Sequence, residues 1–183
     1  IDWHRAKEFS DKIKTINVNQ QQIKFHKPKL YAQGQGIFAD AGSPKGLVAV
    51  CDIGYYSLDW LVFKNGEPVP QDSDATRYGV HMIVTRLKQD LTKRFPNVAI
   101  SEHFAKEAFL SGKCEIAGNE IDLSDDINDE REEYSNYILS ELSSNYGNTY
   151  NFANKIVFSG GGAYHIMEES MPGNAIQSKT PYE

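Results

Sequence analysis

Two short segments of the sequence carry residues that suit the binding of a phosphorylated ligand. Residues 52–59 (DIGYYSLD) follow an apolar run, and residues 159–162 (SGGG) follow another. Ligands of open α/β sheets bind where strands end, so both segments are candidate binding turns. The first offers an acid, a glycine and a hydroxyl, which suit Mg²⁺ and phosphate, and the second offers only backbone. We therefore expect the two turns to form half of a nucleotide cleft.

Each side chain of the first turn has a chemical role that it could perform. Asp52 would hold Mg²⁺ or its waters, and Gly54 would let backbone N–H groups approach phosphate oxygens. Ser57 could donate its hydroxyl, and Asp59 could order the turn or a metal-bound water. The alternative is a plain hairpin in which aspartate and glycine only form the turn.

Other candidate residues are less specific on their own. Three glycines, Gly160, Gly161 and Gly162, could simply end a strand, and they do not form a dinucleotide fingerprint. Gln33 lies in a glycine-flanked connection and could orient a water, although a surface glutamine alone means little. The five histidines are scattered without ligand spacing, which favours structural roles.

Composition limits the possible functions and partners. The chain has 183 residues with 19 basic and 25 acidic side chains, a net charge of −6. This balance argues against a nucleic-acid surface or an anionic membrane as partner. No membrane-length apolar run or signal peptide is visible, and Cys51 and Cys114 lack zinc-type partners, so we expect a cytoplasmic protein. Because the chain starts at Ile1 and stops at Glu183, we expect a fragment, with a processed start as the alternative.

Hydrophobic spacing predicts a mixed sheet with helices on its faces. The predicted helices cover residues 3–16, 76–95, 101–112, 129–146 and 163–171. The predicted strands cover residues 29–32, 47–52, 57–63, 67–70 and 155–158, with additional hairpins at 17–25 and 114–123. Residues 124–128 are expected to be a polar connection.

These motifs together resemble the actin-like ATPase superfamily, and within it the ParM/StbA-like plasmid-segregation proteins. Residues 47–59 resemble the second phosphate segment of that family, and residues 156–163 resemble its adenosine segment. Residues 31–34 (YAQG) resemble the connection between its two lobes, with Ala32 in place of the usual proline. Residues 77–80 (RYGV) resemble the start of the helix that faces the nucleotide, and residues 128–130 (NDE) resemble an acidic turn of ParM. The family's first phosphate loop and the helix beyond residues 180–182 are absent.

The resemblance implies an actin-like (ribonuclease H-like) domain II, with a mixed five-stranded sheet, flanking helices and a small inserted subdomain. Residues 1–27 would be a remnant of the small subdomain of the first lobe. Residues 28–96 and 125–183 would form domain IIA, and residues 97–124 would form the inserted subdomain IIB.

The same resemblance implies a filament-forming ATPase that segregates plasmid DNA, using ATP or GTP with Mg²⁺. Asp52 and Gln33 would be catalytic, and Asp52 and Asp59 would bind the metal. The nucleotide would contact Gly54, Tyr55, Ser57, Gly79, Gly160, Gly161 and Gly162.

The expected partners are further copies of the protein and a DNA-bound adaptor, without direct contact to nucleic acid or membrane. The alternatives are a cell-shape or archaeal actin relative and, from another class, a non-enzymatic assembly or adaptor module with this fold. Because such enzymes hold phosphates between two lobes, we expect the 183-residue chain alone neither to hydrolyse ATP appreciably nor to form normal filaments.

Overall fold

A mixed β-sheet forms the centre of the computed structural model, which describes residues 6–26, 31, 34–42 and 44–178. The strand order is β10-β9-β3-β4-β5, and a further short strand, β6, also pairs with β4. β9 is parallel to both β3 and β10, whereas β3 and β4 are antiparallel. The five-strand mixed sheet expected from the sequence is thereby confirmed. The strands are β3 (Leu47–Ile53), β4 (Leu58–Lys64), β5 (Glu67–Pro68), β6 (Asp74–Thr76), β9 (Lys155–Ser159) and β10 (Ala175–Gln177).

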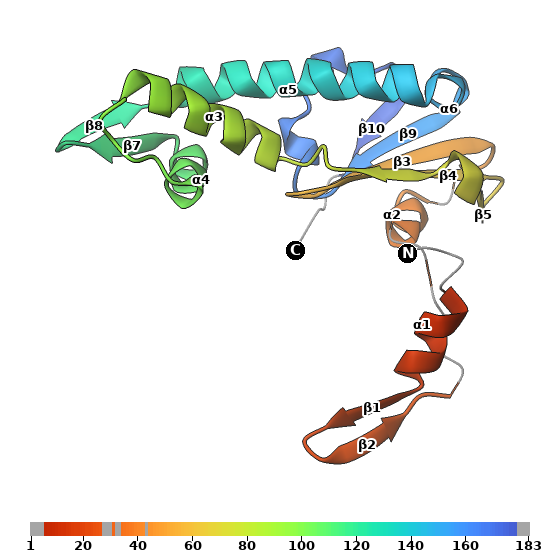
Figure 1. Ribbon diagram of the computed structural model, residues 1–183. Coiled ribbons are helices and arrows are strands. Elements are labelled where there is room, and N and C mark those ends of the chain that lie inside the picture. Colours follow the sequence, from red (N-terminus) through yellow and green to blue (C-terminus); the bar gives the residue numbers. More distant parts are fainter. Residues whose placement is uncertain (1–5, 27–30, 32–33, 43, 179–183) are drawn as a thin grey trace.

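Helices cover the two faces of the sheet unequally (Figure 1). The long helices α3 (His81–Arg94) and α5 (Ser124–Asn145) lie on one face, and the short α2 (Gln35–Asp40) lies on the other. Side chains alternate along β3, so Cys51 belongs to the core beneath α3 and α5 while Val50 belongs to the core beneath α2. Phe38 of α2 stacks on Phe63 with ring centroids 4.4 Å apart, which fixes the short helix to the sheet.

A small unit is inserted between α3 and α5. It consists of α4 (Glu102–Ser111) and the hairpin of β7 (Lys113–Ile116) and β8 (Asn119–Asp122). Ser101 caps α4 by accepting a hydrogen bond from the N–H of Phe104 at 3.0 Å, as its position predicts. In Figure 1 this unit lies at the far end of α3 and α5 from the short helix α6 (Gly147–Phe152).

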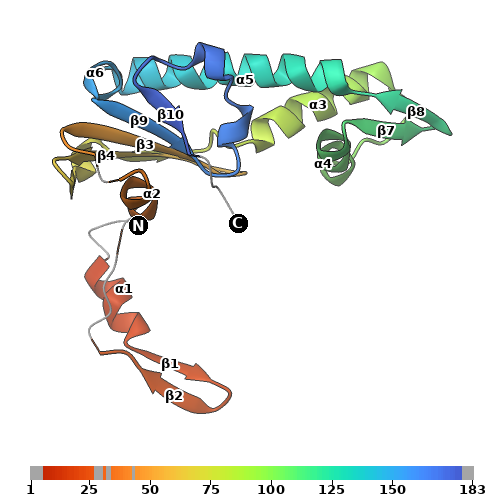
Figure 2. The same ribbon diagram turned by 180° about the vertical axis from the view of Figure 1, so that it is seen from behind.

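The N-terminal segment lies apart from the sheet in both views (Figures 1 and 2). It contains α1 (Ala6–Ile13) and a hairpin of β1 (Thr15–Val18) and β2 (Gln21–Lys24). Its exposed apolar side chains are Phe9, Ile16, Val18, Ile23 and Phe25. The division into a first-lobe remnant, domain IIA and subdomain IIB stays a prediction.

The helix predicted over residues 163–171 is wrong. The chain instead forms two 3₁₀ turns, η3 (Ala163–His165) and η4 (Glu168–Ser170). The N–H of Met167 donates to Ser135 Oγ on α5 at 3.0 Å, so it is not available to the carbonyl of Ala163 as a continuing α-helix would require. Tertiary contact therefore overrides the helical spacing of this segment.

Two helix starts also differ from expectation. α3 begins at His81 because residues 74–76 pair with β4, so residues 77–80 form a turn instead of the first helical turn. Helix α5 begins earlier than expected, at Ser124. The N–H of Ser124 donates to Asp122 Oδ1 at 2.9 Å. The acidic residues of the expected connection thus occupy a helix N-terminus, where the helix dipole favours them.

Helix α2 and strand β10 were not expected from the sequence, and of the strand predicted at 29–32 only Tyr31 lies within the described residues. Among the helices that the structure describes, none is long and apolar enough to cross a membrane. Cys51 and Cys114 are both buried as free thiols.

Candidate nucleotide site

The two turns identified in the sequence lie side by side at one edge of the sheet. Strands β3 and β9 are parallel, with Asp52 opposite Ser159, so the chain leaves both strands in the same direction. The N–H of Gly162 then donates to the carbonyl of Ile53 at 2.8 Å. The prediction that these turns share one edge of the sheet is confirmed.

The close contact between the turns requires glycine. Gly160 has a φ of +82°, and a Cβ there would lie 2.5 Å from both Asp52 Oδ1 and the carbonyl oxygen of Ile53. A Cβ on Gly162 would overlap the side chain of Ile53. Gly161, in contrast, is exposed, and a Cβ there would meet nothing within 4 Å. The turn is therefore packed on both sides of one open position.

A third segment, immediately before α3, holds the other side of the β3–β4 turn. Gly79 packs so closely that a Cβ would overlap the backbone carbonyl of Tyr55. The N–H groups of Val80 and His81 donate to the carbonyls of Gly54 and Tyr55 at 3.1 and 2.8 Å. The start of α3 therefore orients the peptide groups of the turn.

This orientation leaves backbone donors for a ligand. The N–H of Gly54 closes the turn on the carbonyl of Ser57 at 2.8 Å. Within the described residues, no hydrogen bond engages the N–H groups of Tyr55 and Tyr56. Successive backbone N–H groups in a turn form a concavity that binds anions such as phosphate.

Two carboxylates lie beside this turn. Asp52 and Asp59 are directly opposite each other on the antiparallel strands β3 and β4, so their side chains project from the same face. Both are partly buried, and burial raises the pKa of Asp59 above its ordinary value. The described residues contain no group of three His, Cys, Asp or Glu side chains that could hold a metal ion. Two carboxylates can contribute to a Mg²⁺ site when waters or phosphate oxygens supply the remaining ligands.

The Tyr55 side chain contacts both the Tyr56 ring, with centroids 4.7 Å apart, and the inserted unit. Its ring lies 4.8 Å from Lys106 Nζ on α4, and its hydroxyl is buried without a hydrogen-bond partner in the described part of the chain. Any contact of Tyr55 with a phosphate would therefore use its backbone. Ser57 is partly buried in the same turn, and Gln33 lies outside the described residues.

Sequence reasoning missed a polar cluster at the junction of the insert and the sheet layer. Arg131 of α5 lies 5.8 Å from the Phe109 ring of α4, and His165 of η3 lies 5.2 Å from the same ring. Arg131 Nε and His165 Nδ1 are buried without partners among the described residues. Burial, followed by the charge of Arg131, lowers the pKa of His165 to about 4, so its imidazole is neutral near pH 7. The sequence offered one indication of this cluster, because His165 follows Gly162 of the glycine turn by three residues.

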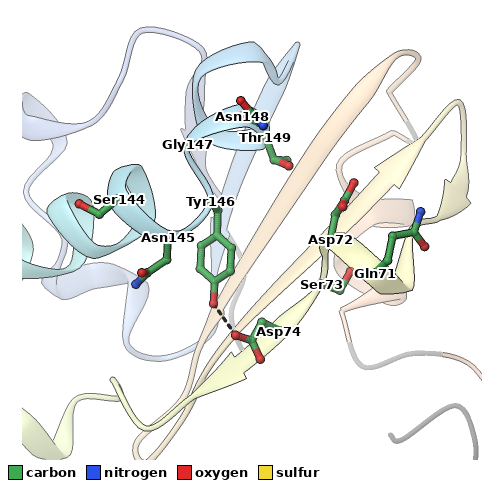
Figure 3. Close-up of a pocket in the computed structure, with 10 residues that line it drawn as sticks. All are labelled: Gln71, Asp72, Ser73, Asp74, Ser144, Asn145, Tyr146, Gly147, Asn148 and Thr149. Atoms are coloured by element: carbon green, nitrogen blue, oxygen red, sulfur yellow. Dashed lines mark hydrogen bonds between the residues drawn. The ribbon is translucent and has the colours of Figure 1, made fainter.

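A separate polar pocket of about 570 Å³ contains none of the glycine-turn residues (Figure 3). One wall comes from residues 71–74 and the other from residues 144–149 at the end of α5 and the start of α6. The hydroxyl of Tyr146 donates to Asp74 Oδ2 at 2.9 Å and thereby connects the two walls. The pocket is distinct from the candidate nucleotide site.

Comparison with family models finds a match over most of the chain. A family model described as archaeal actin homologue MreB-like, C-terminal, matches residues 50–171. No curated protein sequence matches the chain.

Solved structures share the fold. The archaeal actin homolog Ta0583 superposes with a TM-score of 0.72 at 22% identity, covering 88% of this chain and 53% of that chain. The ParM filament structure from Clostridium botulinum superposes with a TM-score of 0.73 at 22% identity. The match covers 97% of this chain and 59% of that chain. ParM from Bacillus thuringiensis with ATP superposes with a TM-score of 0.59 at 15% identity. The match covers 88% of this chain and 45% of that chain. The chain thus spans about half to three-fifths of the two more similar proteins, and neither ParM nor the archaeal homologue is distinctly nearer in structure.

Proposed function

Because the chain belongs to the C-terminal family of MreB-like archaeal actin homologues, we propose that it forms one wall of the nucleotide cleft in an actin-like ATPase. The observation that supports this most is the joining of the two glycine turns at one sheet edge, through the hydrogen bond from Gly162 to Ile53 at 2.8 Å. Structures of Ta0583 in complex with ADP and of Bacillus thuringiensis ParM with ATP add support from proteins of the same fold.

The proposal assigns a role to each candidate residue. The N–H groups of Tyr55 and its neighbours would hold phosphate oxygens, and residues 160–162 would lie against the nucleoside. Gly54 and Gly79 would give the phosphate turn its shape, with Ser57 completing it.

Asp52 and Asp59 would hold a magnesium ion through its waters, and that ion would neutralise charge on the phosphates. Gln33 would orient the water that attacks the terminal phosphate. In the longer protein, a second lobe would close the cleft and exclude bulk water.

The biological setting is also a proposal. The family match favours an archaeal actin relative that assembles into filaments in the cytoplasm, and the ParM filament structure supports plasmid segregation with a DNA-bound adaptor as the second candidate. A non-enzymatic assembly module with the same turns is the alternative from another class. The domain boundaries given above are proposed on the same basis.

Nucleotide binding to the 183-residue chain tests the proposal. We expect Mg-ADP or Mg-ATP to shift the amide NMR signals of Tyr55, Tyr56 and Gly161, and calorimetry to give the affinity. Gly161→Ala adds a methyl at the open position without any neighbour within 4 Å, so the variant should fold normally yet bind at least about tenfold more weakly.

Gly173→Ala is the matched control, because a Cβ at Gly173 also meets nothing within 4 Å and lies outside the glycine turns. Its affinity should equal that of the wild type. The proposal fails if nucleotide shifts no signal at these turns, or if Gly161→Ala binds as well as Gly173→Ala. In the same samples, phosphate release should be small because only one wall of the cleft is present.

A further inference from the structure

His81, the first residue of α3, contacts the turn between β3 and β4 through two of its atoms. Its backbone N–H donates to the carbonyl oxygen of Tyr55 at 2.8 Å, and its ring nitrogen Nδ1 lies 3.2 Å from the same oxygen. The spacing of the histidines in the sequence did not indicate this contact, because it joins residues 26 positions apart. The structure therefore places an imidazole directly on the candidate phosphate turn.

The contact with Tyr55 determines which ring nitrogen of His81 carries hydrogen. A carbonyl oxygen can only accept a hydrogen bond, so Nδ1 must be protonated and must donate. The Tyr55 carbonyl, which has two lone pairs, thus accepts from two donors of His81. The imidazole also packs against the turn, with its centroid 5.6 Å from that of the Tyr56 ring and 6.4 Å from that of the Tyr55 ring. Packing and hydrogen bonding together hold the imidazole in place.

The two donors on this carbonyl decide the direction of a neighbouring N–H group. The peptide that joins Tyr55 to Tyr56 is planar and trans, so the N–H of Tyr56 points opposite to the carbonyl of Tyr55. One peptide earlier, the N–H of Val80 donates to the carbonyl of Gly54 at 3.1 Å, and the N–H of Tyr55 points the opposite way. The N–H groups of Tyr55 and Tyr56 therefore both point away from α3.

The hydrogen bonds to the Tyr55 carbonyl also make the N–H of Tyr56 a better donor. A peptide whose carbonyl accepts a hydrogen bond is polarised, and consecutive hydrogen bonds strengthen one another. The carbonyl of Tyr55 accepts from both the backbone and the ring of His81, whereas the carbonyl of Gly54 accepts from the N–H of Val80. The N–H of Tyr56 should accordingly be the stronger of the two anion ligands in this turn.

We propose that His81 is a positioning residue for a phosphate group of the nucleotide and that it acts through the peptide between Tyr55 and Tyr56. The imidazole donates to the carbonyl on one side of this peptide, and a phosphate oxygen accepts from the N–H on the other side. The inference rests on the proposed nucleotide function. It adds to that function a side chain that contacts the turn and orients its donor.

His81→Phe tests the proposal because it keeps a ring beside Tyr56 but has no side-chain hydrogen for the Tyr55 carbonyl. The backbone N–H of the substituted residue still donates to that carbonyl, so the variant should fold. Calorimetry should show Mg-ATP binding about three- to tenfold more weakly, as expected for one lost hydrogen bond. In the free variant, the amide NMR signal of Tyr56 should shift while that of Gly161 stays. His81→Asn, whose side-chain amide can donate to the same carbonyl, should recover most of the affinity.

Thr85→Val is the matched control, because Thr85 Oγ1 donates to the carbonyl of His81 at 2.7 Å and the substitution removes that hydrogen bond from the same turn of α3. It should bind Mg-ATP as the wild type does. The proposal is overturned if His81→Phe binds as tightly as the wild type, or if Thr85→Val weakens binding equally.

A second measurement covers the case in which His81→Phe does not fold. Nitrogen NMR of the wild-type imidazole should then show hydrogen on Nδ1 of His81, and an Nδ1 without hydrogen would refute the contact with the Tyr55 carbonyl. The two proposals fail in different ways. A wild-type chain that binds no nucleotide overturns the proposed function, and the role of His81 with it. A wild-type chain that binds nucleotide no better than His81→Phe overturns the role of His81 alone.

Discussion

Replacing Gly79 with alanine should separate α3 from the phosphate turn. The alanine Cβ would overlap the carbonyl of Tyr55 and lie 2.6 Å from the carbonyl carbon of Tyr56. These are backbone atoms of a tight turn, so they cannot move aside as the end of a long side chain could. The start of α3 must therefore shift away from the turn.

The expected cost can be worked out from the contacts that the shift affects. Forcing one methyl into a packed position costs about 1–3 kcal/mol. The shift also weakens the hydrogen bonds from Val80 and His81 to the turn, 3.1 and 2.8 Å long, and each is worth about 1 kcal/mol. We expect Gly79→Ala to lower the free energy of unfolding by about 2–4 kcal/mol.

Urea unfolding followed by circular dichroism measures this change, with Gly173→Ala as the control for glycine removal in general. Hydrogen exchange should localise the effect, because the amides of Val80 and His81 should exchange faster while those of β9 stay protected. If the free energy of unfolding of Gly79→Ala lies within about 0.5 kcal/mol of the wild-type value, the turn accommodates the methyl group with little cost. The account of its rigidity would then be wrong.

Two further substitutions test the packing and the electrostatics of the fold. Phe38→Ala should lower the free energy of unfolding by about 3 kcal/mol, measured by urea unfolding, because it removes the stacked ring that fixes α2 to Phe63; a loss below about 1 kcal/mol would contradict this. His165 has a lowered pKa, so the unfolded chain binds a proton that the folded chain refuses, and stability should fall as pH drops from about 6.5 toward 4. His165→Gln should remove up to about 3 kcal/mol of that acid-side loss, and an unchanged acid profile would refute the assignment.

The candidate site was predictable because its signals are local. A buried parallel strand appears as an apolar run, and the polar or glycine residues directly after it mark the edge where ligands bind. Residues 47–53 and 155–159 both show this pattern, so the meeting of Asp52 with Gly160 followed from chain order and strand direction.

The features that the sequence did not reveal depend on distant partners. The N–H of Met167 is taken by Ser135, which lies 32 positions earlier, and no local pattern reports that competition. Helix α2 has six residues and is held by one ring stacked on Phe63, so its formation depends on tertiary packing. The burial of Arg131 and His165 likewise depends on how α4 packs, because both side chains lie against Phe109 of that helix.

The pairing of β3 with β9 has a consequence for how the polypeptide acquires its structure. Val48 pairs with Lys155, and more than a hundred residues separate them, so this central ladder closes a long loop. During synthesis β3 and β4 are made before the inserted unit and α5, whereas β9 is made after them. Until it arrives, an apolar strand has one unpaired edge that could join the same edge of another nascent chain. The unpaired edge of β3 is therefore an aggregation liability until β9 has been made.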